Sequence, residues 1–547
     1  MLQRALILVG LVMAVAACAD LGPYRTQVAQ RSTPSPGSST AAPDCPPAEG
    51  DPGGSELEGS VPAGCAPLAR EDGGDYQLYF AEFDDQGWLY NGDYDGYGGA
   101  SHQIEQLVVD LQQLAANKVP TSVVVFAHGW KHTARFDDPN VRSFRLFLEG
   151  LAEVERGGAG PGASRAGSRQ CQRRVIGVYL GWRGAATTLG PLENITFWNR
   201  KDTAQRVAQG DARVLFAHLR AIQDAANTEW NQAVEQSRQR VARAALRAAS
   251  ATPASASPAA ADEGQLDPCK KLMRLSIAGH SFGGLIVYTS LAQALIRDVV
   301  ELGHAEAQQR ALPPEERVRP ILEREGDLVV VINPAIEATR LEPLYRAARD
   351  AQIEHYNTPT FVSITSEADD ATGKAFPVGR WFDTWFAKYP VDPQDHEKQA
   401  NLRTFGHFEP FLTHHLATLP DVGNRRAPPC EDWGQGDFRA KLGVEDRVLA
   451  GFLAQLSAAS FDARKLGPRT FCGRLTLSLE PSAQAATWVA NSPVWNVRTT
   501  AQVIANHNDF DNPLLLALLR QLYVESVDLS VPQARAIQQR SKAPLSR

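Results

Sequence analysis

Hydrophobic residues along this chain follow two spacings. Some form short, mostly apolar runs of strand length, while others recur at every third or fourth position, as at Leu285, Tyr288 and Leu291. The strand-like runs lie at 122–127, 175–180, 272–278, 328–332, 360–365 and 494–498. This alternation predicts an α/β fold, with a mostly parallel central sheet and helices on both faces.

Other elements are expected around these runs. The folded domain should span 75–547 and open with an antiparallel hairpin, in which 77–83 and 88–90 flank a turn. Apolar residues at helical spacing predict helices over 104–114, over 140–151, from Thr203 toward Ala249 with Leu215, Leu219 and Ile222 buried, and from Pro513 with Leu515, Leu518 and Leu522 on one face.

Two stretches interrupt this pattern. Residues 250–266 are low in complexity and predict a disordered linker. Residues 373–490 do not have the pattern of a sheet and are rich in aromatic residues such as Trp381 and Trp385, so we expect an inserted cap between the last two strands. The aromatic side chains either form the core of this cap or line an acyl pocket, and the sequence leaves both open.

The first residues, 1–17, predict a signal peptide. Arg4 gives a positive start, and the apolar run at 5–14 is too short to span a bilayer. Residues 14–16 fit an ordinary signal peptidase site, whereas the sequence Val-Ala-Ala-Cys at 15–18 resembles a bacterial lipobox.

A lipobox implies that Cys18 becomes the lipidated first residue of the mature protein. We favour this interpretation because a cysteine there is otherwise unexplained, and because residues 18–74 form a polar, low-complexity tether. Ala19 stands where the resemblance would place an inner-membrane retention aspartate. We therefore expect the protein to lie in the cell envelope, where it is anchored in the outer membrane and faces the periplasm.

Six further cysteines agree with export to an oxidising compartment. An even number of them predicts up to three disulfides, and no C-x-x-C spacing favours a metal. Pairing of sequence neighbours would give Cys45–Cys65, Cys171–Cys269 and Cys430–Cys472. The middle pair has a physical argument, since both residues precede parallel strands that start at the same edge of the sheet. The other connectivities stay open.

Composition narrows the function. The 547 residues are 43% hydrophobic and 21% charged, which suffices for a large core. A net charge of −7 and the absence of a basic patch give no indication of nucleic-acid binding.

Candidate chemistry centres on Gly279-His280-Ser281-Phe282-Gly283, a G-x-S-x-G motif between a strand-like run and a helical pattern. A sharp turn from strand to helix would expose the hydroxyl of Ser281, and only small residues fit beside it. The following helix would point its positive end at developing negative charge. The alternative is a glycine-rich turn with a packing role alone.

Further candidates lie at the carboxyl ends of other strand-like runs. His128-Gly129-Trp130 follows residues 122–127, where the N–H of Trp130 could form one wall of an oxyanion hole, unless the stretch is an ordinary turn. Asp369 follows a later run, with Asp370 and Glu337 as rival acids. His507 follows the last run, with His407 as the rival base and His414 and His415 near it.

With these motifs the chain resembles a serine esterase or lipase of the α/β-hydrolase superfamily, from Tyr76 to about Tyr523. The motifs are A-H-G-W at 127–130, G-H-S-F-G-G at 279–284, S-E-A-D-D at 366–370 and N-H-N-D at 506–509, in the order that this superfamily uses. The resemblance implies the α/β-hydrolase fold and catalysis without a cofactor or metal.

By the same resemblance Ser281 is the nucleophile, His507 the general base and Asp369 the acid that orients it, while the N–H groups of Trp130 and Phe282 hold the oxyanion. The expected function is hydrolysis of carboxylic esters, on a small-molecule or lipid substrate, by a protein held at the membrane through Cys18. The alternatives are acyl transfer on the same fold and a non-catalytic hydrolase-like binding module.

Overall fold

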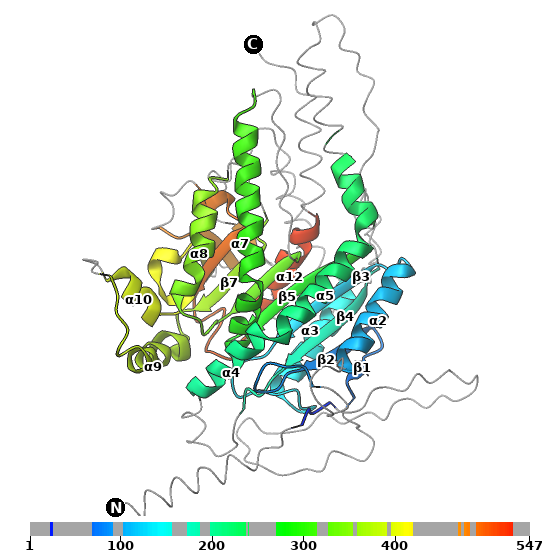
Figure 1. Cartoon of the computed structure of the whole chain (residues 1–547), viewed down its shortest axis with the longest axis horizontal. Helices are drawn as coiled ribbons and strands as arrows, with labels where there is room; N and C mark the ends of the chain where they lie inside the picture. The colour runs from blue at the N-terminus through cyan, green and yellow to red at the C-terminus, as the bar shows by residue number, and fades with distance from the viewer. Residues whose placement is uncertain are drawn as a thin grey trace, which may run out of the picture.

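A single sheet of 11 strands runs through the computed structural model (Figure 1). The strand order is β1-β2-β4-β3-β5-β6-β7-β11-β8-β10-β9. The structure describes residues 22–25, 68–90, 102–155, 172–185, 197–236, 239, 270–313, 326–353, 358–390, 395–419, 469–471, 475–481 and 488–528.

Seven neighbouring strands form the parallel body of the sheet. In spatial order they are β2 (Tyr76–Glu82), β4 (Arg174–Gly181), β3 (Thr121–Ala127), β5 (Met273–His280), β6 (Leu328–Ile332), β7 (Phe361–Ser366) and β11 (Val494–Thr499). Every residue of β3, β6 and β7 is buried, because helices cover both faces of the sheet. The predicted α/β class with a mostly parallel sheet is confirmed.

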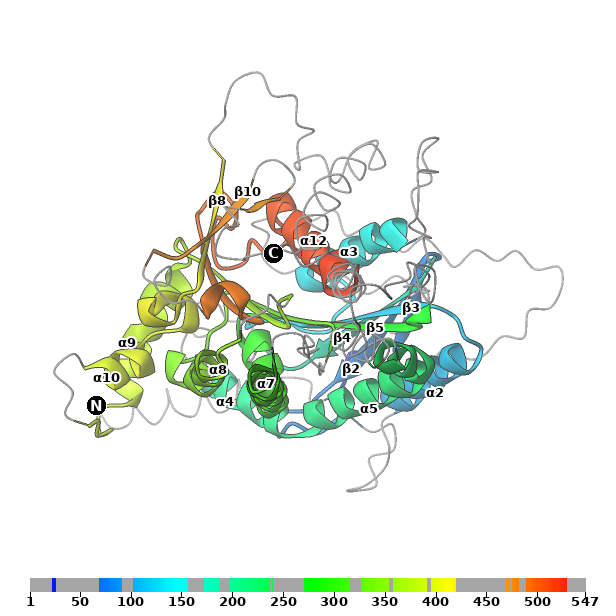
Figure 2. The ribbon, with the colours of Figure 1, turned by 90° about the horizontal axis from the view of Figure 1, so that it is seen from above.

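Helices lie in two layers (Figure 2). One layer contains α2 (His102–Ala116), α4 (Phe197–Gln209), α5 (Asp211–Ala226), α7 (Phe282–Arg310) and α8 (Ala338–Asp350), and the other contains α3 (Pro139–Glu155) and α12 (Pro513–Asp528). Leu107, Leu215 and Leu285 join the core on the first side. Val141 and Leu515 belong to cores on the second side, so both faces are sealed by apolar packing.

The expectation that residues 373–490 contain no sheet is wrong. Three strands from this segment extend the sheet: β8 (His414–Thr418) lies parallel to β11, β10 (Leu475–Leu479) is antiparallel to β8, and β9 (Arg469–Phe471) is antiparallel to β10. β8 and β10 alternate buried and partly exposed residues, so they lack the continuous apolar run of a central strand. The cap is consequently smaller than expected.

In the described residues the remaining cap consists of short helices between β7 and β8. It begins with a π-helical turn, Ala371–Ala375, and continues through α9 (Phe376–Asp383) and α10 (His396–Leu402). Two single 3₁₀ turns, Phe405–His407 and Glu409–Phe411, then lead into β8.

The long helix expected from Thr203 starts earlier, at Phe197, and is broken at Gly210 between α4 and α5. A Cβ on Gly210 would lie 2.4 Å from the carbonyl oxygen of Gly87, so the turn after β2 passes too close for a side chain. The buried face of Leu215, Leu219 and Ile222 is confirmed. The expected hairpin is present but short: Phe83 pairs antiparallel with Leu89, and the N–H groups of Asp84 and Tyr90 donate to the carbonyl oxygens of Trp88 and Glu82 at 2.8 and 3.0 Å.

A flexible tether over the whole of 18–74 is also wrong, because residues 22–25 dock on the domain. Arg25 is buried and pairs with Glu71, its Nε donates to the carbonyl oxygen of Ala134 at 2.7 Å, and its guanidinium lies 3.7 Å from the centre of the Phe80 ring. The N–H of Arg25 donates to Glu82 at 2.8 Å. β1 (Arg70–Asp72) then pairs with β2.

Several predictions lie outside the described residues. These are the signal peptide at 1–17, the linker at 250–266, the lipidation site Cys18, and the six cysteines of the proposed disulfides, Cys45, Cys65, Cys171, Cys269, Cys430 and Cys472. Among the helices that the structure does describe, none combines the length and the apolar character needed to cross a bilayer.

Candidate active site

Ser281 stands at the turn between β5 and α7. It has φ 55° and ψ −119°, a left-handed conformation that is strained for a residue with a side chain. Two of the flanking glycines are required by space: a Cβ on Gly279 would lie 2.5 Å from the carbonyl oxygen of Gly283, and a Cβ on Gly283 would lie 2.0 Å from that of Ala127. The turn thus depends on its glycines, as the motif predicts.

The ring of His507 joins Ser281 to Asp369. Its Nε2 lies 2.8 Å from Ser281 Oγ, and its Nδ1 lies 2.8 Å from Asp369 Oδ2. A carboxylate only accepts hydrogen bonds, so Nδ1–H donates to Asp369 and the bare Nε2 accepts from the Ser281 hydroxyl. This tautomer leaves Nε2 able to take the serine proton.

Asp369 is buried just after β7 and accepts several hydrogen bonds. The Thr372 hydroxyl donates to Oδ2, and the N–H groups of Ala371 and Thr372 donate to Oδ1 at 3.0 and 3.2 Å. Burial raises the pKa of Asp369, but hydrogen bonds from His507 and Thr372 and the His507 charge outweigh it, and the net pKa lies below the usual value. The carboxylate therefore stays charged beside the imidazole.

The two rival acids are engaged elsewhere. Asp370 is exposed and pairs with Lys374 at 2.7 Å. Glu337 is buried at the start of α8, where it pairs with Lys201, with Arg340 at 3.0 Å and with Arg380 at 3.2 Å. Neither carboxylate has a hydrogen bond to His507.

The rival base, His407, lies behind the acid rather than beside the serine. Its Nε2 is 3.1 Å from Thr372 Oγ1, and burial lowers its pKa to about 4. His414 contacts the Trp495 ring, with ring centres 4.5 Å apart, and His415 belongs to β8, between β11 and β10. No group of three or more His, Cys, Asp or Glu residues suited to a metal occurs in the described ranges.

The main chain of His507 is held by two residues whose role the sequence did not show. Its carbonyl oxygen accepts from His280 Nε2 at 2.7 Å and from Asn333 Nδ2 at 3.0 Å. Asn333, with φ 43°, also accepts the N–H of Ser366 at 3.0 Å and so connects the ends of β6 and β7. The only sequence signal for it is an Asn-Pro pair directly after a strand.

His280 is neutral, because burial and the neighbouring His507 lower its pKa well below the usual value. Its Nε2 must carry the proton, since the partner is a carbonyl oxygen, and Nδ1 has no hydrogen-bond partner. His280 also contacts the His507 ring, at 5.0 Å between centres. His280 therefore supports the loop that carries His507.

The segment His128-Gly129-Trp130 lies directly against Ser281. A Cβ on Gly129 would be 2.9 Å from Ser281 Cβ, so only glycine fits here. His128 holds the segment in place: its Nδ1 contacts the Gly129 carbonyl oxygen at 2.9 Å, its Nε2 accepts the N–H of Trp182 at 3.1 Å, and its own carbonyl oxygen accepts Trp182 Nε1 at 2.8 Å.

The two proposed oxyanion donors thus flank Ser281. Phe282 is the first residue of α7, where a backbone N–H has no acceptor within the helix. Trp130 follows Gly129, and its ring packs edge-to-face on Phe197 at 5.1 Å. Phe197 in turn contacts the Phe282 ring at 4.8 Å. Aromatic side chains therefore surround the serine on the side of α4.

Comparisons with protein families, with curated proteins and with solved structures found no match to this chain.

Proposed function

We propose that this protein is a serine hydrolase with the α/β-hydrolase fold, which cleaves carboxylic esters without a metal or cofactor and is anchored in the cell envelope through a lipid on Cys18. The observation that carries the proposal is the chain of hydrogen bonds from Ser281 Oγ through His507 to Asp369, 2.8 Å at each step. The strained turn of Ser281 at the start of α7 supports it.

In the proposed reaction, Ser281 Oγ attacks the ester carbonyl carbon while His507 Nε2 accepts the hydroxyl proton. Asp369 stabilises the imidazolium, and the N–H groups of Phe282 and Trp130 stabilise the oxyanion. His507 then protonates the leaving alcohol, which leaves an acyl group on Ser281. Water, deprotonated by His507, releases the acid and restores the serine.

Labelling by a fluorophosphonate probe tests the proposal. The wild-type protein should be labelled, and Ser281→Ala should not. Ser276→Ala is a matched control, because Ser276 lies on the same strand and its buried hydroxyl has no hydrogen-bond partner. A folded wild-type protein that resists labelling would instead favour the non-catalytic binding module.

Acyl transfer is the second candidate, because an alcohol can replace water at the acyl-enzyme. Product analysis with added alcohols distinguishes the two reactions. A dominant transesterified product at low alcohol concentration would establish the transferase.

A further inference from the structure

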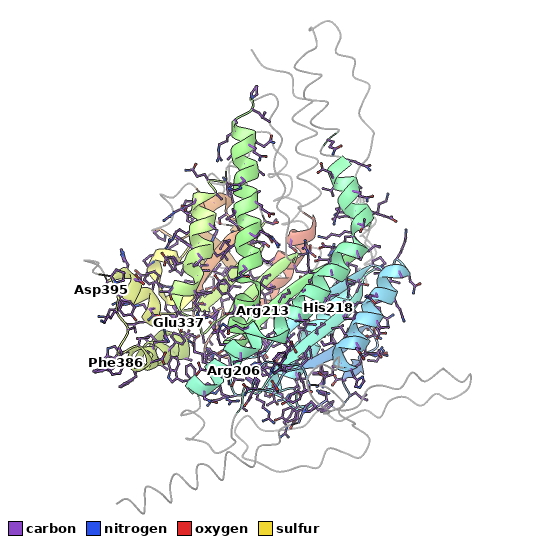
Figure 3. The ribbon with its side chains drawn as sticks, viewed as in Figure 1. Arg206, Arg213, His218, Glu337, Phe386 and Asp395 are labelled. Atoms are coloured by element: carbon purple, nitrogen blue, oxygen red, sulfur yellow. The ribbon has the colours of Figure 1, made fainter. Side chains whose placement is uncertain are left out.

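One face of the cap carries a cluster of exposed aromatic side chains on α9 and the residues after it. The exposed fractions are 46% for Trp381, 65% for Phe382, 60% for Trp385 and 93% for Phe386. Val378 on the same helix is also exposed. Clusters of this size on a protein surface mark sites of interaction. Figure 3 shows Phe386 at the outer edge of the molecule, with Glu337 further in.

The opposite face of α9 is firmly fixed to the domain. Phe376 is buried against Trp198, and a Cβ on Gly379 would lie 2.3 Å from the Trp198 ring. Arg380 pairs with Glu337 at 3.2 Å and donates to Asn401 at 2.8 Å. Trp381 and Phe382 therefore stand on an anchored helix, and Trp385 and Phe386 lie in the turn directly after it.

The aromatic rings also support one another. Trp381 lies edge-on to Phe382 at 4.9 Å and to Trp385 at 4.5 Å. Two nearby cations are paired, Lys374 with Asp370 and Arg380 with Asp383, and Lys388 is exposed just beyond Phe386. The side chains of the cluster itself are uncharged and include two tryptophans, a composition that suits the interface between lipid headgroups and acyl chains.

The position of the N-terminal segment, residues 22–25, indicates that the partner of this cluster is a lipid bilayer. Residues 22–25 bind at the carboxyl ends of β2 and β3, where Arg25 contacts Glu82 and Ala134. That is the edge of the sheet at which Ser281 and α9 also lie, toward the bottom of Figure 1. Four residues from Cys18 to Gly22 span at most about 14 Å. A lipid on Cys18 would therefore hold this edge close to the bilayer.

We propose that the aromatic cluster, Val378, Trp381, Phe382, Trp385 and Phe386, inserts into the surface of the lipid bilayer and turns the Ser281 edge toward it. If Ser281 acts as proposed above, the preferred esters are those whose acyl chains reside in that bilayer. The membrane docking does not depend on the enzyme proposal, because it rests on the exposed aromatic cluster and on the expected lipid anchor at Cys18.

Vesicle binding tests this proposal in the full-length chain with Cys18→Ser, which removes the lipid but leaves α9 intact. The protein is sedimented with phosphatidylcholine vesicles and with phosphatidylethanolamine–phosphatidylglycerol vesicles. We expect binding to both, and at least about 10-fold weaker binding after Trp385→Ser with Phe386→Ser. Leu146→Ser is the control, since Leu146 is 67% exposed on α3 but lies outside the cluster, and it should not change binding.

Hydrolysis of soluble p-nitrophenyl acetate, measured in parallel without vesicles, separates this proposal from the enzyme proposal. The double variant should keep the wild-type rate. If vesicle binding depends on Trp385 and Phe386 in a protein that has no esterase activity, the proposed membrane docking stands and the proposed enzyme function is refuted. Normal hydrolysis with binding unaffected by the double variant would refute the docking, as would a wild-type dimer that the variant converts to a monomer.

Discussion

At the residue scale, His507 is held at both its ring and its backbone. The ring lies between Ser281 and Asp369, while the carbonyl oxygen accepts hydrogen bonds from His280 and Asn333. These two donors therefore set the angle at which the imidazole meets the serine.

Asn333→Gly tests this support. Glycine accepts the left-handed backbone of Asn333, so the substitution removes the side-chain bonds without adding strain. We expect the turnover number for a soluble ester to fall about 10-fold with little change in KM, because a displaced base costs rate rather than binding.

The matched control is Gln352→Gly, at an exposed position with φ 45° at the end of α8. It changes the same backbone conformation far from His507 and should leave the turnover number unchanged. Equal losses in both variants would show that Asn333 contributes only general stability.

His128 links stability to pH. Burial lowers its pKa to about 4 from the usual 6.5, so the unfolded chain binds this proton first as the pH falls. The contribution of the neutral imidazole is therefore complete above about pH 6.5 and is lost between about pH 6.5 and 4, amounting to about 3 kcal/mol at most. The free energy of unfolding, measured by denaturant titration, should decline more steeply over this window in the wild type than in His128→Asn. Parallel declines would contradict this assignment.

The sequence predicts the residues of the site better than their supports. The G-x-S-x-G motif identifies Ser281, the end of a strand identifies Asp369, and the order along the chain identifies His507. The catalytic roles of these residues stay predictions. His280 and Asn333 act through contacts with segments far away in the sequence, as in the 174 positions between Asn333 and His507. No local pattern encodes such contacts.

At the element scale, the turn from β5 into α7 is the most tightly constrained piece of the fold. Gly283 →Ala would place a methyl group 2.0 Å from the carbonyl oxygen of Ala127, and neither backbone has room to move. We expect a loss of more than about 3 kcal/mol in the free energy of unfolding, together with loss of fluorophosphonate labelling.

Gly150→Ala is the matched control for this turn, because a Cβ on Gly150 in α3 meets nothing within 4 Å. It should stabilise the protein by about 0.5–1 kcal/mol, since alanine favours a helix over glycine. Chemical denaturation of both variants measures the difference. A Gly283→Ala protein of wild-type stability would refute the constraint.

The central strands could be predicted from the sequence, whereas the strands added beyond β11 could not. Buried strands such as β3 are continuous apolar runs, which hydrophobicity alone identifies. β8 and β10 bury alternate residues only, so their short polar-apolar patterns are hidden within an aromatic-rich stretch. The break between α4 and α5 at Gly210 involves a close approach of Gly87, 123 positions earlier in the sequence. The periodicity of apolar residues along a helix does not predict such a contact.

At the scale of the whole molecule, the N-terminal segment belongs to the folded domain. Arg25 and Arg145 share Glu71, a half-buried residue of the edge strand β1. Residues 22–25 are too few to show a periodic pattern, and low-complexity sequence surrounds them. The sequence therefore did not predict that they dock on the domain.

Glu71→Gln should release this segment. Burial raises the pKa of Glu71, but hydrogen bonds and charges from Arg145 and Arg25 outweigh it, so the carboxylate stays charged and its loss leaves two guanidinium groups poorly compensated. We expect a cost of about 3 kcal/mol and rapid trypsin cleavage after Arg25. Asp137→Asn, which removes an exposed partner of Arg135, should cost less than about 1 kcal/mol and leave that site protected. Unchanged protection in Glu71→Gln would contradict the docking of this segment.

The spacing of the triad along the polypeptide has a consequence for biogenesis. Ser281 and His507 are 226 positions apart, and His507 follows β11, the last described strand along the chain. If Ser281 and His507 act as proposed, a chain that emerges from its N-terminus would carry the serine long before the histidine and would have no esterase activity until both are in place. Recovery of probe labelling after dilution from denaturant would consequently report the formation of this long-range contact rather than of the β5–α7 turn alone.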